Sequence, residues 1–312
     1  GCVTPDTIQK LYGKTLNLSA SQIDRQAECR LSYFLKYGLR AQERKEAKID
    51  PAEFGTYVHA VLENTARCIR DMGGFSQVSL EETLNIAHRY SEEYAAERFS
   101  QLDSQRISYL FRRNMKELDM IVQELWTELK DSLFSPTGFE VSFGGGEGLP
   151  AITIPNNSMN AILRGFVDRV DTWNTSGSSY YRVVDYKTGK KDFDYCDVFN
   201  GVGLQMLLYM FALRNSGDEM LGKHPVPAGV QYFPARVPYV SADGKLDEMQ
   251  ADKERSALRK RRGLLLRDEN VLQAMEPGET PRRMCYTVKK DGSLAGDLAD
   301  REQLKLLEKY IF

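Results

Sequence analysis

Gly165-Phe-Val-Asp168-Arg-Val-Asp171 and, after an intervening turn, Asp185-Tyr186-Lys187-Thr-Gly189 make up the stretch that decides the fold of this chain. Residues 161–173 and 180–187 are rich in Ile, Val, Tyr and Phe, and the segment between them, residues 174–179, has the composition of a turn. The sequence therefore predicts a β-hairpin. If the hairpin is symmetric about Ser176 and Gly177, the numbers of facing residues sum to 353, as 168 and 185 do.

The predicted hairpin brings two carboxylates together on one face. Cross-strand neighbours have Cβ atoms about 5 Å apart, so Asp168 and Asp185 could ligate one cation. Side chains alternate along a strand, so Lys187 points to the same face and Tyr186 points away. An Asp and a Lys two positions apart are usually a solvated ion pair. Apolar neighbours argue for a metal ion instead, because a charge among them is costly unless something compensates it; those expected on this face are Phe166, Val170, Tyr181 and Val183.

Two further polar groups stand in helical patterns. Gly55-Thr-Tyr-Val-His59 opens one helical stretch, and the chain has only three histidines. On its own, His59 is an ordinary helix histidine. Gln205-Met-Leu-Leu-Tyr209 lies in an apolar helix, where positions four apart share a face, so an amide and a phenol emerge side by side.

The ordered set Gly55-x-x-x-His59, Gly165-x-x-Asp168, Asp185-Tyr-Lys187 and Gln205-x-x-x-Tyr209 resembles the nuclease domain of the RecB and AddB type, within the PD-(D/E)XK superfamily. Two flanking segments, Leu18–Leu39 with Cys29 and Val230-Gln-Tyr-Phe-Pro234, look most like AddB, a component of AddAB helicase-nucleases. The resemblance implies an α/β fold with a restriction-endonuclease-like core. Its mixed central sheet is flanked by helices, and its N-terminal region is helical.

The resemblance also implies a chemistry, the metal-dependent hydrolysis of DNA phosphodiester bonds. Asp168 and Asp185 would hold Mg²⁺ or Mn²⁺, with His59 and the Tyr186 carbonyl as further ligands. Lys187 would orient the water or neutralise developing charge in the transition state. The remaining assignments are weaker or indirect: Gln205 and Tyr209 as supporting and DNA-contacting residues, and Glu140, on the first core strand, as a weaker candidate ligand.

The net charge of −2 gives no overall sign of nucleic-acid binding, so DNA contacts must be local. Basic residues gather around the hairpin: Arg164, Arg169, Arg182, Lys187, Lys190 and Lys191. A short basic run, Arg259-Lys-Arg-Arg262, follows downstream and could equally be a solvated helix face. We find no signal peptide, no apolar run long enough to span a membrane, and no G-x-x-x-x-G-K-[ST] loop for an ATP motor. The resemblance implies DNA and an AddA-like helicase-nuclease subunit as partners, and we expect no membrane association.

Five cysteines without C-x-x-C pairing argue against a disulfide framework and favour a cytoplasmic protein. AddB-like proteins often carry a [4Fe-4S] cluster held by one cysteine near the start of the domain and three near its C-terminus. Cys29 matches the first ligand of such a full-length protein, but no triplet follows. We therefore expect no cluster in this chain, which we interpret as an excised domain or a cluster-free relative, with its two ends loosely anchored.

The expected organisation is a tether over residues 1–15, a helical part over 16–138, the catalytic core over 139–235 and an accessory region over 236–312. The function that the resemblance implies is that of an exonuclease acting in double-strand-break processing and recombination repair. Two alternatives stay open: a stand-alone Cas4-like exonuclease, which should keep its full cysteine set, and an inert DNA-binding scaffold, which should have lost Asp168, Asp185 or Lys187. All three of these residues are present.

Overall fold

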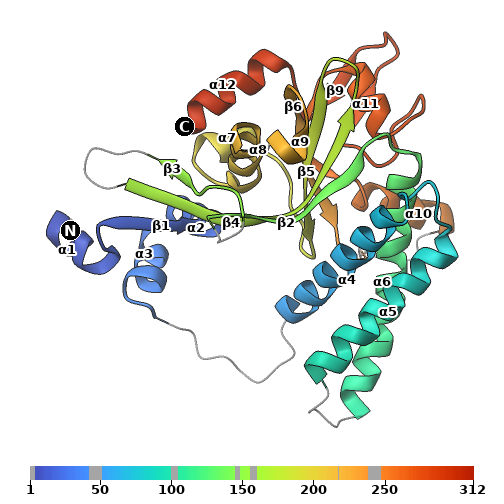
Figure 1. Cartoon of the computed structure of the whole chain (residues 1–312), viewed down its shortest axis with the longest axis horizontal. Coiled ribbons are helices and arrows are strands. Elements are labelled where there is room, and N and C mark those ends of the chain that lie inside the picture. Colours follow the sequence, from blue (N-terminus) through green and yellow to red (C-terminus); the bar gives the residue numbers. More distant parts are fainter. Residues whose placement is uncertain are drawn as a thin grey trace.

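The computed structural model describes residues 4–41, 51–99, 105–144, 148–154, 160–216, 218–237 and 247–312. These residues build a mixed sheet in the order β1-β4-β5-β6-β7-β10, with β2 and β3 also paired to β4 (Figure 1). The strands of this sheet are β1 (Thr15–Ser19), β2 (Ser135–Phe143), β3 (Ile152–Ile154), β4 (Asn160–Asn174), β5 (Ser179–Lys187), β6 (Pro225–Pro234), β7 (Arg262–Leu266) and β10 (Leu298–Ala299).

The predicted hairpin is β4 and β5, and its register is confirmed. Six residue pairs run from Asn174↔Ser179 to Arg169↔Val184. In every pair the two residue numbers have the expected sum, so the turn at Ser176 and Gly177 alone fixed the alignment of the strands. β5 then runs parallel to β6, whereas β6 and β7 are antiparallel. The α/β fold with a mixed central sheet is therefore confirmed.

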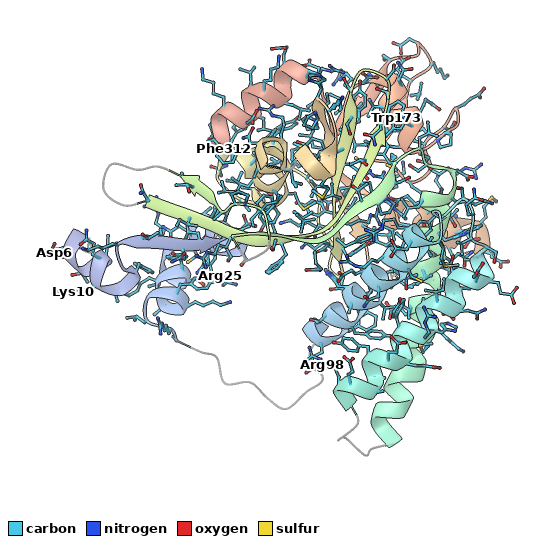
Figure 2. All side chains as sticks on the ribbon, in the orientation of Figure 1. Asp6, Lys10, Arg25, Arg98, Trp173 and Phe312 are labelled. Carbon is cyan, nitrogen blue, oxygen red and sulfur yellow. The ribbon has the colours of Figure 1, made fainter. Side chains whose placement is uncertain are left out.

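Helices cover both faces of the sheet (Figure 1), and Figure 2 shows the side chains that lie between the layers. One face packs against α4 (Pro51–Asp71), α5 (Leu80–Phe99) and α6 (Gln105–Asp131), which share a core cluster with Val184 and Tyr186 of β5. The other face packs against α8 (Gln205–Ser216), which in turn contacts α12 (Arg301–Ile311). Helix α11 (Glu269–Met275) lies beside the end of α6, where the Leu133 N–H donates to the Ala274 carbonyl.

Helix α8 belongs to the connection between the parallel strands β5 and β6, with α7 (Tyr195–Phe199) before it and α9 (Asp218–Leu221) after it. Residues 206–213 are all buried. A helix that is apolar all round must be covered on every side, and α8 is covered by the sheet and by α12. This burial fixes the direction in which α8 presents Gln205 and Tyr209.

The N-terminal region is more structured than a tether. Residues 1–15 include α1 (Pro5–Tyr12) and the first residue of β1, which pairs in parallel with the start of β4. A capping box formed by Ser19 and Gln22 then starts α2 (Ala20–Glu28), which is followed by α3 (Arg30–Tyr33) and the π-helix η1 (Phe34–Gly38).

The C-terminal end is firmly packed, so the expectation of a loose anchor was wrong. Leu304 and Leu307 of α12 are buried in the main core. Glu308 pairs with Arg214 of α8 at 2.7 Å, and the Tyr310 hydroxyl donates to the Phe199 carbonyl at 2.8 Å. Residues 236–312 also supply β7 and β10 to the central sheet, besides α10 (Glu248–Leu258) and a small hairpin of β8 (Tyr286–Val288) and β9 (Leu294–Gly296).

Among the described residues, no helix has both the length and the hydrophobicity needed to cross a bilayer.

Candidate active site

Asp168 lies where the β4–β5 pairing ends, one step beyond the Arg169↔Val184 pair. Its Oδ2 atom accepts a hydrogen bond from the Tyr186 N–H at 2.7 Å. The N–H and C=O of one strand residue point to the same edge of the strand, so the Tyr186 carbonyl also faces the β4 side. The hairpin end thus gathers a carboxylate and a backbone carbonyl at one place.

His59 and Glu140 complete a group of candidate ligands around Asp168. His59 comes from α4, and its Nδ1 atom is 3.4 Å from Asp168 Oδ2. Glu140 lies on β2, between two residues that pair with Arg169 and Val167, and so faces Asp168 across the strands. One ligand atom from each of the three residues lies within 4.8 Å of the others.

Glu140 has an unusual backbone. Its φ is 44°, in the left-handed region that residues with a Cβ rarely adopt. Such strain persists only where the surroundings impose it, and it gathers at functional sites. The sequence marks Glu140 only as a weaker candidate, because no pattern of residue types reveals a single strained position within a strand.

The carboxyl groups of this cluster resist ionisation. Burial and the negative charge of Asp185 raise the pKa of Asp168 to about 6, although His59, the Tyr186 N–H and Lys187 act in the opposite direction. Burial and the charges of Asp168 and Glu63 raise the pKa of Glu140 to about 7. Acidic groups that repel one another in a partly desolvated place are stabilised by a cation.

Asp185 lies outside the three-residue group and holds Lys187 instead. The Lys187 Nζ atom is 2.6 Å from Asp185 Oδ2, the Asp185 side chain is 6% exposed, and the Lys187 side chain is 33% exposed. The ammonium is therefore anchored at its inner side while still reaching solvent. Asp185 acts on Asp168 through its charge, as the raised pKa of Asp168 shows.

Gln205 and Tyr209 reach the same end of the sheet from α8. Tyr209 is buried, its ring stacks on Phe143 at 5.4 Å, and its hydroxyl is hydrogen-bonded to Gln205. Burial and the charges of Asp185 and Asp168 raise the pKa of Tyr209 to about 12. The phenol is therefore a neutral hydrogen-bonding group beside the two carboxylates.

Gly165 leaves room for the Tyr209 hydroxyl. A Cβ atom at position 165 would lie 1.7 Å from the Tyr209 Oη atom and 2.7 Å from Cζ. Because Phe143 holds the ring, Gly165→Ala should destabilise the protein by about 2 kcal/mol and displace Tyr209. Thermal melts should show a loss that Tyr209→Phe partly relieves in the double variant. Gly177→Ala, in the open hairpin turn, is the control; equal melting temperatures of the two alanine variants would contradict the close fit.

Three of the basic residues assigned to DNA contacts are buried, and that assignment was wrong for them. Arg169, Arg182 and Arg261 are each at most 1% exposed. Their guanidinium groups bind Glu128 of α6 at 3.1, 3.1 and 2.6 Å, and Arg169 and Arg182 also bind Asp171. Burial alone would raise the pKa of Glu128, but the three guanidinium groups outweigh it and lower the pKa to about 2.

The buried network of Glu128, Asp171 and the three arginines contacts the site through Tyr186. Arg169 donates to the Tyr186 hydroxyl at 3.1 Å, and the Tyr186 ring meets the His59 ring edge-on at 5.6 Å. Tyr186 therefore joins the network to both His59 and Asp168. Its side chain points away from the carboxylates, as strand alternation predicts, and contacts Arg169 and His59 instead.

Cys29 is exposed at the start of α3, where its sulfur accepts the Ser32 N–H. Cys68, Cys196 and Cys285 are also free thiols. The expectation that this chain holds no iron-sulfur cluster stays a prediction.

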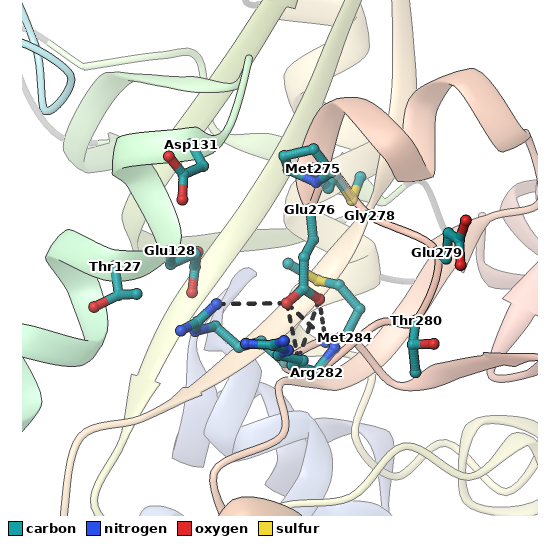
Figure 3. A pocket seen from close by; sticks show the side chains of 12 residues that line it. Thr127, Glu128, Asp131, Met275, Glu276, Gly278, Glu279, Thr280, Arg282 and Met284 are labelled. Atoms are coloured by element: carbon teal, nitrogen blue, oxygen red, sulfur yellow. Dashed lines mark hydrogen bonds and ion pairs between the residues drawn. The ribbon is translucent and has the colours of Figure 1, made fainter.

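A separate hollow of about 510 Å³ lies between α6 and the segment after α11, and Figure 3 shows the side chains around it. Its central carboxylate, Glu276, already accepts the backbone N–H groups of Arg282, Arg283 and Met284 and pairs with the Arg283 guanidinium. This carboxylate closes a loop and is fully engaged by its hydrogen bonds and ion pair.

The residues around Asp168 fit a hard divalent cation. Carboxylate and carbonyl oxygens suit Mg²⁺ and Mn²⁺, and one imidazole is compatible with Mn²⁺. The raised pKa values of Asp168 and Glu140 add a physical reason for a positive charge at this place. Asp168, Glu140 and His59 are the nearest candidate ligands.

Comparison with known proteins agrees with this geometry. Residues 17–285 match the family model of the PD-(D/E)XK nuclease superfamily. Similar curated proteins are named as the B-type subunits of ATP-dependent helicase/deoxyribonucleases. The one from Clostridium novyi is 32% identical over 319 residues, covering 99% of this chain and 28% of that protein. The one from Oceanobacillus iheyensis is 29% identical over 316 residues, covering 98% of this chain and 27% of that protein. The chain thus spans about a quarter of the length of these relatives.

Proposed function

Because this chain belongs to the PD-(D/E)XK nuclease superfamily, we propose that it is a deoxyribonuclease that depends on Mg²⁺ or Mn²⁺. The observation that carries the proposal is the cluster of His59, Glu140 and Asp168, whose ligand atoms lie within 4.8 Å of one another. A bound divalent ion would lower the pKa of a water molecule and offset charge on the phosphate.

The chain's own residues would hold and orient the reactants. Asp168, Glu140 and His59 would bind the ion, and Asp185 would keep Lys187 extended toward solvent at the edge of the cluster. The Lys187 ammonium would donate to the phosphate or to the attacking water as negative charge develops. The neutral Tyr209 phenol, held by Gln205, would donate a hydrogen bond at the same end of the sheet.

We further propose that the domain works on DNA as an exonuclease beside an AddA-like helicase-nuclease subunit, in double-strand-break processing and recombination repair in the cytoplasm. The support is the name of its relatives, which joins a helicase and a deoxyribonuclease in one complex. The proposal also rests on the alignment of 97–99% of this chain with a part of those proteins.

Lys187→Ala tests the assignment of chemistry to this cluster. The substitution should lower kcat about 100-fold or more, because a preorganised donor acts mainly in the transition state. Mn²⁺ affinity, measured by calorimetry, should be nearly unchanged, since the three candidate ligands remain. Lys290→Ala, which removes an exposed ammonium from the turn between β8 and β9, is the control and should leave kcat unchanged. A parallel fall in metal affinity and rate would instead make Lys187 a structural part of the site.

Metal binding should depend on pH because two candidate ligands must lose protons. With the pKa of Glu140 near 7 and that of Asp168 near 6, both are ionised above pH 8 and largely protonated below pH 6. Mn²⁺ affinity should therefore be about 20-fold weaker at pH 6 than at pH 8, with protons released on binding. Calorimetry in buffers of different ionisation enthalpy measures both quantities. A pH-independent affinity would show that these carboxyl groups are not ligands.

A further inference from the structure

A basic groove lies next to Lys187, where the loop after β5 meets the end of α10 and the start of β7. Its lining includes Lys187, Lys190, Lys191, Asp192, Lys260 and Arg262. These residues come from two segments about 70 positions apart, which β6 brings together by pairing with β5 on one side and β7 on the other.

The groove carries a strong excess of positive charge. Five cationic side chains and a single carboxylate belong to its lining. That carboxylate, Asp192, lies 3.3 Å from Lys190 Nζ and 3.4 Å from Arg262 Nε, and so spans the two segments. The chain as a whole has a net charge of −2, which makes this groove a local feature and not a reflection of the overall composition.

The basic run at residues 259–262 contributes two of the cationic side chains of the groove, because successive side chains of the run point in opposite directions. Arg259 and Arg261 turn inward to Glu124 and Glu128 of α6. Lys260 and Arg262 turn the other way and line the groove. Arg259 and Arg261 thus pair with the glutamates of α6, whereas Lys260 and Arg262 line the same groove as Lys187.

We propose that this groove binds the phosphate backbone of the DNA strand beside the bond to be cleaved, with Lys260 and Arg262 as positioning residues. The inference rests on the proposed function, and it adds a surface to it. Proteins that bind single strands without regard to sequence hold the phosphate backbone in a positively charged groove. Lys187, which lines the groove and pairs with Asp185 of the site, would act on one phosphate, while Lys260 and Arg262 hold neighbouring phosphates of the strand.

The test is DNA binding by the 312-residue chain, separated from cleavage by EDTA. A fluorescein-labelled single-stranded oligonucleotide is titrated by anisotropy at several salt concentrations. The double variant K260A/R262A should bind about 10-fold more weakly at low salt, and the slope of log K against log salt should fall by about 1.4, as for two lost phosphate contacts. K289A/K290A removes two exposed charges from the β8–β9 turn and should leave both values unchanged. K260R/R262K, which keeps both charges, should bind as the wild type does.

Cleavage in Mn²⁺ supplies the second readout. A positioning role predicts that K260A/R262A raises KM with little change in kcat. Equal affinities and salt slopes in the wild type and K260A/R262A would overturn the groove assignment even if the wild type cleaves DNA. If the wild type fails to cleave but K260A/R262A still loses affinity and salt dependence, the nuclease proposal falls while the groove assignment is supported.

Discussion

Asp168→Asn should abolish DNA cleavage, by about 1000-fold or more, and at the same time stabilise the metal-free protein at pH 8. The loss of activity follows from removing a candidate ligand, whereas Asn can still accept the Tyr186 N–H. The gain in stability follows from the raised pKa of Asp168. Because the folded protein holds this proton more tightly than the unfolded chain, the unfolding free energy falls as pH rises from about 4 to about 6.

Above that range the full cost of the ionised carboxylate is present, so its removal should raise the unfolding free energy by roughly 3 kcal/mol. Thermal melts in EDTA at pH 8 and pH 3 measure the effect, which should vanish at the lower pH, where Asp168 is protonated in the unfolded chain as well as in the folded protein. Added Mn²⁺ should raise the melting temperature of the wild type but not of Asp168→Asn. A variant that cleaves DNA like the wild type, or that is less stable in EDTA at pH 8, would contradict this account of Asp168.

Glu128→Ala should destabilise the protein by about 4 kcal/mol or more and could prevent folding. Three guanidinium groups depend on this carboxylate, and its removal leaves them buried with too little negative charge. The milder Glu128→Gln keeps the side-chain volume and one acceptor oxygen for the guanidinium groups, and should give a folded protein with a smaller loss of stability. Asp252→Ala, which breaks the exposed Asp252–Arg255 pair, should cost less than about 1 kcal/mol.

The lowered pKa of Glu128 sets the pH range of this contribution. Its stabilisation is present above the ordinary carboxyl pKa of 4.5 and is lost as pH falls toward about 2. Urea denaturation at pH 7 and pH 3 measures the difference in unfolding free energy between the wild type and Glu128→Gln, which should be smaller at the lower pH. Equal unfolding free energies at pH 7 would mean that Glu128 contributes little to stability.

The register of the hairpin could be predicted because it depends on neighbouring residues. The turn at residues 174–179 aligns the two strands, and the alignment then places Asp168 and Lys187 at one end. Helix α8 was also predictable, since eight consecutive buried residues leave an unmistakable apolar run. In both cases the information lies within about 20 residues.

The burial of Arg169, Arg182 and Arg261 could not be predicted in the same way. Arginine is mostly exposed in proteins unless it is paired, and the partner that draws these three inward, Glu128, lies on a distant helix. The same reason applies to β7. Its short apolar run, Gly263-Leu-Leu-Leu266, indicates a strand only once β6 is known to offer it an edge.

Glu140 illustrates a third limit, since its place in the site depends on one backbone torsion. The left-handed φ of 44° lies within a regular strand, and a sequence pattern with a period of two residues carries no sign of it. What reveals Glu140 is its position opposite Asp168 and its distance from His59.

The most direct test of the central claim is to locate Mn²⁺ by its anomalous scattering in crystals of this chain grown or soaked at pH 8. The account predicts one strong peak at about 2.0–2.4 Å from oxygens of Asp168 and Glu140 and from a His59 nitrogen, on the side of Asp185 and the Tyr186 carbonyl. A peak elsewhere, or no peak at this place with saturating Mn²⁺, would contradict the claim that these residues form the metal centre of a nuclease.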